Sequence, residues 1–231
     1  MPRARSQKQD EWQTAAANEE AGGCLSFYIL PPLAALLISC LLTVLALNLG
    51  PTQTIALQSS SSTTSTNLSP IFTREVQHWA TDITRWANAS SLDPNLVAVI
   101  MQIESCGDPR AISGAGAMGL FQVMPFHFHF GENPYNPETN ALRGLNYLSR
   151  SLETAGGNPR LALAGYNGGI GVIARGEWTW STQTQRYVYY GVPIYEDARS
   201  GATSSPVLEE WYRKYGAGLC RQADQRLGSI P

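Results

Sequence analysis

Charged side chains are scarce in this chain, and over one long stretch they are missing altogether. Lys and Arg together number 16, and Asp and Glu number 18, in 231 residues with a net charge of -2. Residues 21–73 contain none of these four residue types. Proteins that bind nucleic acid through its phosphates carry a surplus of basic side chains. The composition therefore gives no support for a nucleic-acid partner, and the gap in charge divides the chain into regions.

Histidine and alternating strand patterns are also rare. The three histidines are His78, His127 and His129, and no spacing typical of metal ligands surrounds them. We therefore predict no metal site and no cofactor, and we expect the His127/His129 pair at the surface or the rim of a cleft. Only residues 111–119 and 178–180 could form a short hairpin. The fold class predicted is mainly α, with at most a small hairpin.

The uncharged stretch contains a mostly apolar run at residues 25–49. A run of roughly 20 apolar residues can cross a bilayer, and this one is longer than is typical of a buried core helix. Arg3, Arg5 and Lys8 precede it, so the positive-inside rule places a tail at 1–24 in the cytoplasm and the rest of the chain outside. We expect an N-terminal transmembrane helix that is kept as an anchor. A cleaved signal peptide is the alternative.

A polar segment follows the expected anchor. Residues 58–70 read "QSSSSTTSTNLSP", with no aromatic or charged residue. Such a composition buries too little apolar surface to fold. Residues 50–70 are therefore predicted to be a linker, and residues 71–231 to be the folded domain, a suitable length for one domain.

Several helix starts can be predicted in this domain. Asp93-Pro94, Asn136-Pro137 and Asn158-Pro159 each combine a capping side chain with proline at the first helical position. Before them, apolar residues recur every three or four positions, as on one face of a helix; they are Phe72, Val76, Trp79, Ile83 and Trp86. Residues 204–216 and 218–228 indicate two short closing helices.

Glu104 lies at the end of the segment "LDPNLVAVIMQIES", which is apolar almost all round and predicts a central buried helix. Apolar surroundings and the negative end of a helix both raise the pKa of a carboxyl group. A carboxyl that stays protonated near neutral pH can serve as a general acid. The alternative is an exposed glutamate at a helix end, which an isolated Glu-Ser pair would favour.

Three further motifs change this interpretation. They are "GAMGLFQVMP" at residues 116–125, "AGYNGG" at 164–169 and "TQTQRYV" at 182–188. Each alone is compatible with core packing or turn chemistry. Their order and spacing after Glu104-Ser105 indicate one functional site.

These four blocks resemble the soluble-lytic-transglycosylase (SLT) family, whose catalytic domain is related to goose-type lysozyme. The resemblance covers residues 74–192 and implies a lysozyme-like (α+β) helical domain with a C-terminal helical extension. It implies that Glu104 is the catalytic acid and base. The substrate-binding residues implied are Ser105, Met118, Gln122, Tyr166, Asn167, Tyr187 and Gln183. Gln183 is a departure, since the family often has a supporting glutamate there.

The resemblance also implies a reaction on peptidoglycan glycan strands. Ordinary glycosidases use two carboxyls, and no second acidic residue here lies in a matching motif. The family instead cleaves the β-1,4 bond between N-acetylmuramic acid and N-acetylglucosamine with help from the substrate, leaving a 1,6-anhydro sugar. Two alternatives stay open: a hydrolytic goose-type muramidase, and an inactive glycan-binding or scaffold relative. Gln183 favours the inactive relative, and the intact Glu104-Ser105 pair argues against it.

The four cysteines fall into two groups. Cys24 and Cys40 lie in or beside the expected span, whereas Cys106 and Cys220 lie on the outer side, where disulfides form. We predict a Cys106–Cys220 bridge that ties the C-terminal helix to the loop after Glu104. The expectation is thus a single-pass membrane protein with an extracytoplasmic catalytic domain in the cell envelope. Its expected partners are glycan strands and, through residues 25–49, the membrane; the sequence does not identify a protein partner.

Overall fold

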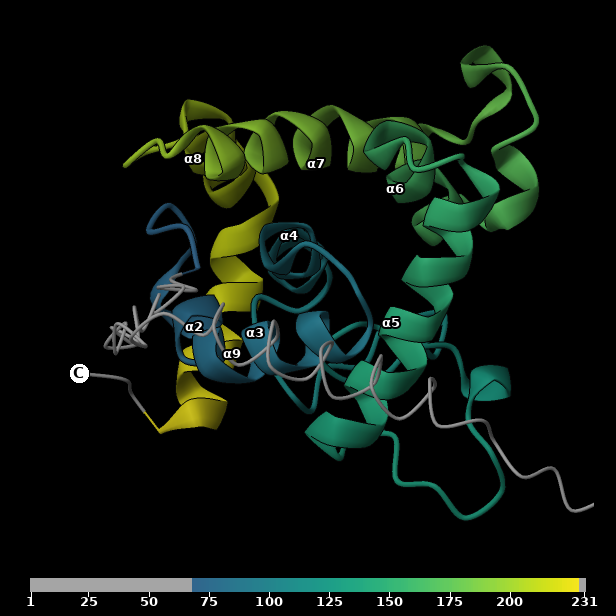
Figure 1. Ribbon diagram of the computed structural model, residues 1–231. Helices are drawn as coiled ribbons and strands as arrows, with labels where there is room; N and C mark the ends of the chain where they lie inside the picture. The colour runs from purple at the N-terminus through teal and green to yellow at the C-terminus, as the bar shows by residue number, and fades with distance from the viewer. Residues whose placement is uncertain (1–67, 229–231) are drawn as a thin grey trace, which may run out of the picture. The chain divides into compact units, whose positions relative to one another are not determined.

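Capping side chains followed by proline begin four of the α-helices in the described part of this protein. The computed structural model describes residues 68–228, which are drawn in colour in Figure 1. The α-helices in this region are α2 (Arg74–Gln77), α3 (Ala80–Ala89), α4 (Pro94–Glu104), α5 (Pro137–Thr154), α6 (Pro159–Gly168), α7 (Thr182–Ser200), α8 (Pro206–Trp211) and α9 (Ala217–Leu227). Short 3-10 turns are η1 (Pro125–His127), η2 (Ile170–Val172) and η3 (Glu177–Thr179), and η4 (Tyr212–Gly216) is a π-helical turn.

The predicted helix starts are confirmed. The side chain of Asp93 accepts a hydrogen bond from the main chain of Asn95 at the start of α4, and Asn136 and Asn158 cap α5 and α6 in the same way. Ser205, followed by Pro206, caps α8. A cap supplies an acceptor for main-chain N–H groups that lack an intrahelical partner. These helix starts are therefore encoded locally in the sequence.

Helix α4 lies in the middle of the domain, with α7 on one side and α3 on another (Figure 1). Its residues from Leu96 to Gln102 are all buried. The apolar composition of this helix thus matches its central position, as predicted. Its last residue, Glu104, therefore lies where the helix leaves the core.

Helix α7 is a long helix for which the sequence offered no clear pattern. It packs against α4 and α6 and contains Pro193 in its interior. Proline removes one intrahelical hydrogen bond and usually ends a helix. Here the helix continues to Ser200 because its buried face is held by its two neighbours.

Two local expectations need correction. The amphipathic segment starting near Phe72 is divided into α2 and α3, with Trp79 between them. The indole of Trp79 donates a hydrogen bond to the Gly107 carbonyl at 2.9 Å, which fixes the chain at the break. The possible hairpin at residues 178–180 is wrong, because η3 occupies this stretch and the Trp180 indole donates to the Val172 carbonyl.

Residues 68–228 form no β-strand, so the fold in this region is mainly helical as predicted. The loop at 111–119 contains isolated bridges in which Met118 pairs with Ile112 and with Val123. These isolated bridges are the only pairing in this loop that corresponds to the expected small hairpin. Within the same residues, no helix has the length and apolar character needed to cross a membrane. The expected span at 25–49 and the tail before it lie outside the described residues.

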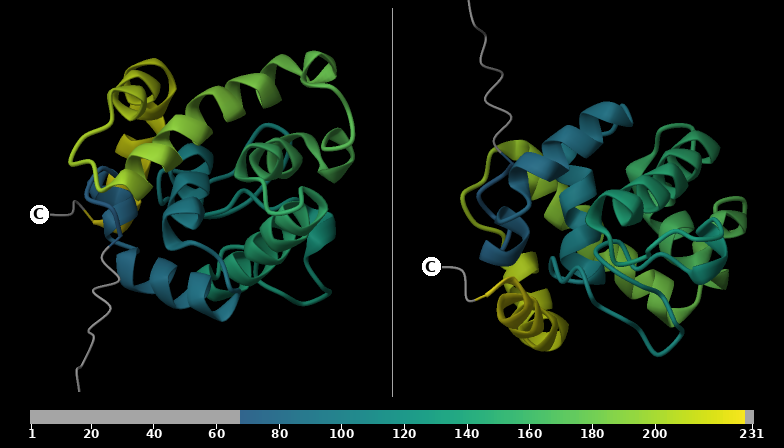
Figure 2. Two further views of the ribbon diagram at one scale, coloured as in Figure 1. Left: turned by 45° about the horizontal axis from the view of Figure 1, so that its top comes forward. Right: turned by 90° about the horizontal axis from the view of Figure 1, so that it is seen from below.

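The C-terminal segment is more continuous than expected. Helix α8, the π-turn η4 and helix α9 follow one another without a break, instead of forming two separate helices. Helix α9 packs against α2, near the start of the domain (Figure 2). The predicted disulfide is confirmed: Cys106 and Cys220 are bonded, with their Cα atoms 5.0 Å apart. It ties α9 to the loop that follows α4.

Candidate functional site

Glu104 lines a cavity of about 160 Å³ at the end of α4. The cavity is walled by side chains from α4, α6, α7 and the C-terminal segment; besides Glu104 they are Ile103, Asn167, Gln183, Arg186, Tyr187, Tyr190, Trp211, Tyr215 and Leu219. Glu104 is the only carboxylate among these lining residues. Three of the predicted substrate-binding residues, Asn167, Gln183 and Tyr187, therefore share a cavity with the predicted acid.

The environment of Glu104 favours its neutral form. Burial removes water from the carboxyl and raises its pKa to about 8, while the nearby hydroxyl of Tyr187 acts in the opposite direction. The Tyr187 hydroxyl lies close enough to the Glu104 carboxyl to lower its pKa. It is nevertheless buried and has no hydrogen-bond partner within the described residues. At neutral pH most of the Glu104 population carries a proton, as a general acid requires.

Tyr187 also stays neutral. Burial raises its pKa well above the usual value, and the Glu104 carboxyl adds to this effect. The hydroxyl is thus a hydrogen-bond donor at any physiological pH. Because the hydroxyl lies near enough to Glu104 to affect its pKa, its unused donor can stabilise a carboxylate once the proton has left.

A second hollow, of about 340 Å³, adjoins the first. It is lined by Gln122, Val123, Met124, Phe126, His127, Gly144, Tyr147, Tyr166, Asn167, Gly168 and Gly169. Asn167 lines both hollows, so they meet at this residue. The arrangement is an extended site with Glu104 on one side of Asn167 and Gln122 on the other. His127 lies at the edge of the second hollow, in agreement with the expected cleft rim.

Asn167 is positioned by the motif that surrounds it. The hydroxyl of Thr184 donates a hydrogen bond to its side-chain oxygen at 3.1 Å. A Cβ atom at Gly168 would lie only 2.7 Å from the same hydroxyl oxygen, so glycine allows this close approach of α6 and α7. The Asn-Gly-Gly and Gln-Thr motifs, which are distant in sequence, are therefore joined at the meeting point of the two hollows.

The loop carrying Gln122 is held in place by hydrogen bonds from side chains of α5 and α6. The Tyr166 hydroxyl donates to the Phe121 carbonyl at 2.8 Å. The buried side chain of Asn140 accepts a hydrogen bond from the Phe121 main chain and donates to the carbonyls of Met118 and Pro134. Asn140 was not predicted from the sequence, where the available signal was a polar residue on the same face of α5 as Gly144 and Leu148.

Ser105 and Met118 are not among the residues that line either hollow. The hydroxyl of Ser105 is buried, donates to the Leu120 carbonyl at 2.7 Å and accepts from the Gly107 main chain at 3.1 Å. It thus fixes the chain directly after Glu104 against the following loop. Met118 makes main-chain hydrogen bonds with Val123. Both residues shape the wall of the site from behind.

The C-terminal segment supplies lining residues that the motifs did not reveal. Trp211, Tyr215 and Leu219 come from α8, η4 and α9 and face the Glu104 cavity. Their sequence pattern indicates closing helices only, so no signal pointed to a place beside Glu104. The disulfide at Cys220, one residue after Leu219, holds this wall to the loop after Glu104.

Comparisons with known proteins agree with this geometry. The family described as "Transglycosylase SLT domain" matches residues 82–187, a range that includes Glu104, Gln122, Asn167 and Tyr187. The chain is 39% identical over 99 residues to a transglycosylase of Enterobacteria phage PRD1, which covers 42% of this chain and 35% of that protein. It is 30% identical over 102 residues to a soluble lytic murein transglycosylase of Salmonella typhimurium, covering 39% and 16%.

A further relative is the endo-type membrane-bound lytic murein transglycosylase A of Klebsiella pneumoniae, 36% identical over 76 residues, covering 26% of this chain and 36% of that protein. The alignments thus span between 16% and 36% of the length of these relatives. Residues 82–187 of this chain thus match the transglycosylase SLT domain family, and the relatives that it resembles carry transglycosylase names.

Proposed function

We propose that this protein is a peptidoglycan lytic transglycosylase. It cleaves the β-1,4 bond between N-acetylmuramic acid and N-acetylglucosamine and leaves a 1,6-anhydro end. The observation that carries the proposal is Glu104, which has a pKa of about 8 and is the only carboxylate lining either hollow of the described site. The names of the relatives, a transglycosylase and lytic murein transglycosylases, support the same activity.

The first step uses the proton that Glu104 holds. The carboxyl donates this proton to the glycosidic oxygen, and the electron pair of the breaking C1–O bond goes to that oxygen. The carbonyl oxygen of the muramic 2-acetamido group bonds to C1, and the positive charge passes from C1 to the oxazolinium ring that forms. The substrate thereby supplies the group that a second carboxylate supplies in ordinary retaining glycosidases.

The second step uses Glu104 as a base. Its carboxylate accepts the proton of the muramic C6 hydroxyl, and the C6 oxygen attacks C1 and displaces the acetamido oxygen. Glu104 is again protonated and no water is consumed. The Tyr187 hydroxyl donates toward the carboxylate between the two steps, and Asn167, Gln122 and Gln183 offer hydrogen bonds to the sugars. Tyr166, Ser105 and Met118 hold the walls in place.

The membrane anchor is part of the proposal. Residues 25–49 would span the membrane, with a cytoplasmic tail at 1–24 and a linker at 50–70 that places the domain in the cell envelope. The apolar run itself and the name of one relative, which is membrane-bound, support this arrangement. Alkaline extraction of membranes should leave the full chain in the pellet and release a chain that begins at residue 68; a soluble full chain would contradict the anchor.

The experiment that tests the activity is digestion of purified peptidoglycan followed by mass analysis of the products. The parent protein should release fragments with 1,6-anhydro ends, and Glu104→Gln should lower the rate by at least roughly a thousandfold with unchanged circular dichroism. Glu177→Gln, an exposed glutamate outside the cleft, is the matched control and should retain activity. Reducing ends in the products would identify a hydrolase instead. No products from the parent protein, with strands still bound, would identify an inactive glycan-binding relative.

A further inference from the structure

Arg186 is a cation in the wall of the Glu104 cavity that makes no ion pair within the described residues. Several other arginines are paired with carboxylates; they are Arg74, Arg85, Arg143, Arg160 and Arg199. Arg186 differs from all of these in lying beside the proposed catalytic acid. Its charge is therefore available to a ligand in the cavity.

The guanidinium of Arg186 is held by an aromatic ring. Its central carbon lies 4.8 Å from the centre of the Tyr215 ring, as in a cation–π contact. Such stacking uses the flat face of the guanidinium and leaves its N–H edges free. Those edges form the planar fork that binds a carboxylate through two parallel hydrogen bonds.

Glu210, an acid linked to Tyr215 through Tyr190, already has other partners. Glu210 accepts hydrogen bonds from the Tyr190 hydroxyl at 3.1 Å and from Lys214 at 2.6 Å. Tyr190 in turn packs edge-on against Tyr215, with ring centres 5.7 Å apart. The contacts thus fix the Tyr215 ring and occupy Glu210, which leaves Arg186 without a carboxylate.

Tyr215 lies outside residues 82–187, the range of the family match. The wall that carries it is joined to the loop after Glu104 by the Cys106–Cys220 disulfide. The pairing therefore joins Arg186, which lies within the matched range, to a residue of the C-terminal segment beyond it.

We propose that Arg186, supported by Tyr215, is a carboxylate-binding site in the Glu104 cavity, and that it recognises an acidic substituent of the glycan strand. The proposal rests on the proposed function for the identity of the polymer. In peptidoglycan the carboxylate can come from the peptide stems or, where stems are removed, from the lactyl group of N-acetylmuramic acid. Both sources present the same planar group to the guanidinium.

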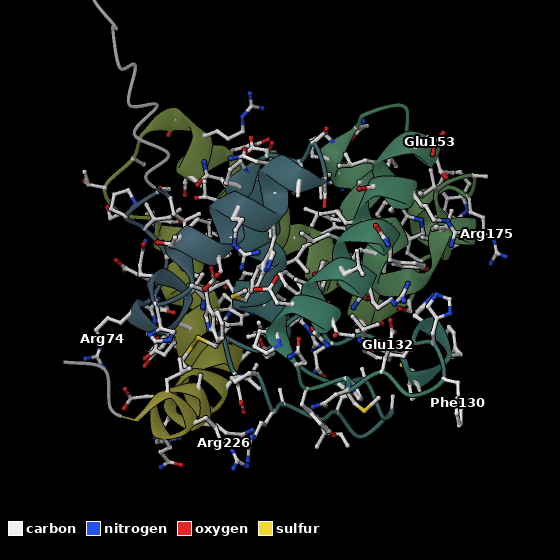
Figure 3. The ribbon with its side chains drawn as sticks, turned by 60° about the horizontal axis from the view of Figure 1, so that its bottom comes forward. Arg74, Phe130, Glu132, Glu153, Arg175 and Arg226 are labelled. Atoms are coloured by element: carbon white, nitrogen blue, oxygen red, sulfur yellow. A yellow bond between two sulfur atoms is a disulfide. The ribbon has the colours of Figure 1, made fainter. Side chains whose placement is uncertain are left out.

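The test measures binding in a Glu104→Gln background, so that it does not depend on turnover. Soluble strands are prepared with peptide stems and without them, and half of each sample has its carboxylates converted to methylamides. Titration calorimetry then gives the preference for the acidic over the amidated form. The variants are Arg186→Gln, Arg186→Lys, Tyr215→Phe and Tyr215→Ala. The control is Arg175→Gln, because Arg175 is exposed and lies on the outside of the domain (Figure 3).

We expect the Glu104→Gln protein with Arg186 intact to bind acidic strands roughly tenfold more tightly than amidated strands. In Arg186→Gln this ratio of affinities should fall to about one. Arg186→Lys and Tyr215→Ala should keep part of it, whereas Tyr215→Phe and Arg175→Gln should keep all of it. If Arg186→Gln loses the preference with strands that carry peptide stems, the bound carboxylates are those of the peptide. If it loses the preference with strands without stems, the bound carboxylate is that of the lactyl group. The proposal would be overturned if Arg186→Gln kept the preference for acidic strands, or if the Glu104→Gln protein with Arg186 intact showed no such preference. Failure of the parent protein to cut any strand would overturn the proposed function alone.

Discussion

At the scale of single residues, the raised pKa of Glu104 makes a direct prediction about pH. The free enzyme needs the protonated carboxyl, so kcat/KM should fall as the pH rises through about 8. The Tyr187 hydroxyl lowers this pKa, so Tyr187→Phe should move the fall to higher pH. Rates on soluble strands between pH 3 and pH 10 would show the shift. A fall centred near the ordinary pKa of glutamate, at about 4.3, would contradict the assignment of Glu104 as the acid.

The sequence could identify Glu104 and several cleft residues because they occur in recognisable motifs. It could not identify Asn140 or Arg186 in the same way. Asn140 acts through three main-chain groups of a loop, and Arg186 through a ring from another segment. Such contacts exist only after folding brings the partners together, so no local pattern marks them.

At the scale of elements, the packing of the Gln122 loop on α5 depends on one buried amide. Asn140→Ala would remove its three hydrogen bonds and leave buried main-chain groups without partners. We expect it to lower the free energy of unfolding by about 3 kcal/mol. Asn146→Ala, an exposed change on the same helix, should have little effect. Urea unfolding of both variants measures this, and equal stability would contradict the role given to Asn140.

The helix starts show why some elements were predictable and others were not. A cap followed by proline, as at Asp93 or Asn158, acts within a few residues and can be read directly. Helix α7 was not predicted, because its stability depends on packing against α4 and α6 and the proline in its interior, Pro193, is unfavourable in a helix. The separation of α2 from α3 also depends on a distant partner, the Gly107 carbonyl.

At the scale of the whole molecule, the disulfide joins parts of the domain that are 114 residues apart. Closing a loop of this length restricts the unfolded chain, and its loss should destabilise the domain by about 4 kcal/mol. The double variant Cys106→Ser/Cys220→Ser avoids an unpaired thiol and should unfold at lower denaturant concentration than the oxidised parent. Adding reductant should bring the parent to the same midpoint. Two unchanged midpoints would show that the bridge does not stabilise the fold.

The position of Cys220 also sets the order in which the site is completed. Cys220 lies 114 residues after its partner and follows every residue that lines the Glu104 cavity, so the covalent link can form only after all of these segments have been synthesised. The wall that carries Trp211 and Tyr215 is therefore the last part of the cavity to be fixed. A chain shortened before Cys220 can contain every motif of the family and still lack this wall, and cellular thiol oxidation becomes a step in the maturation of the site.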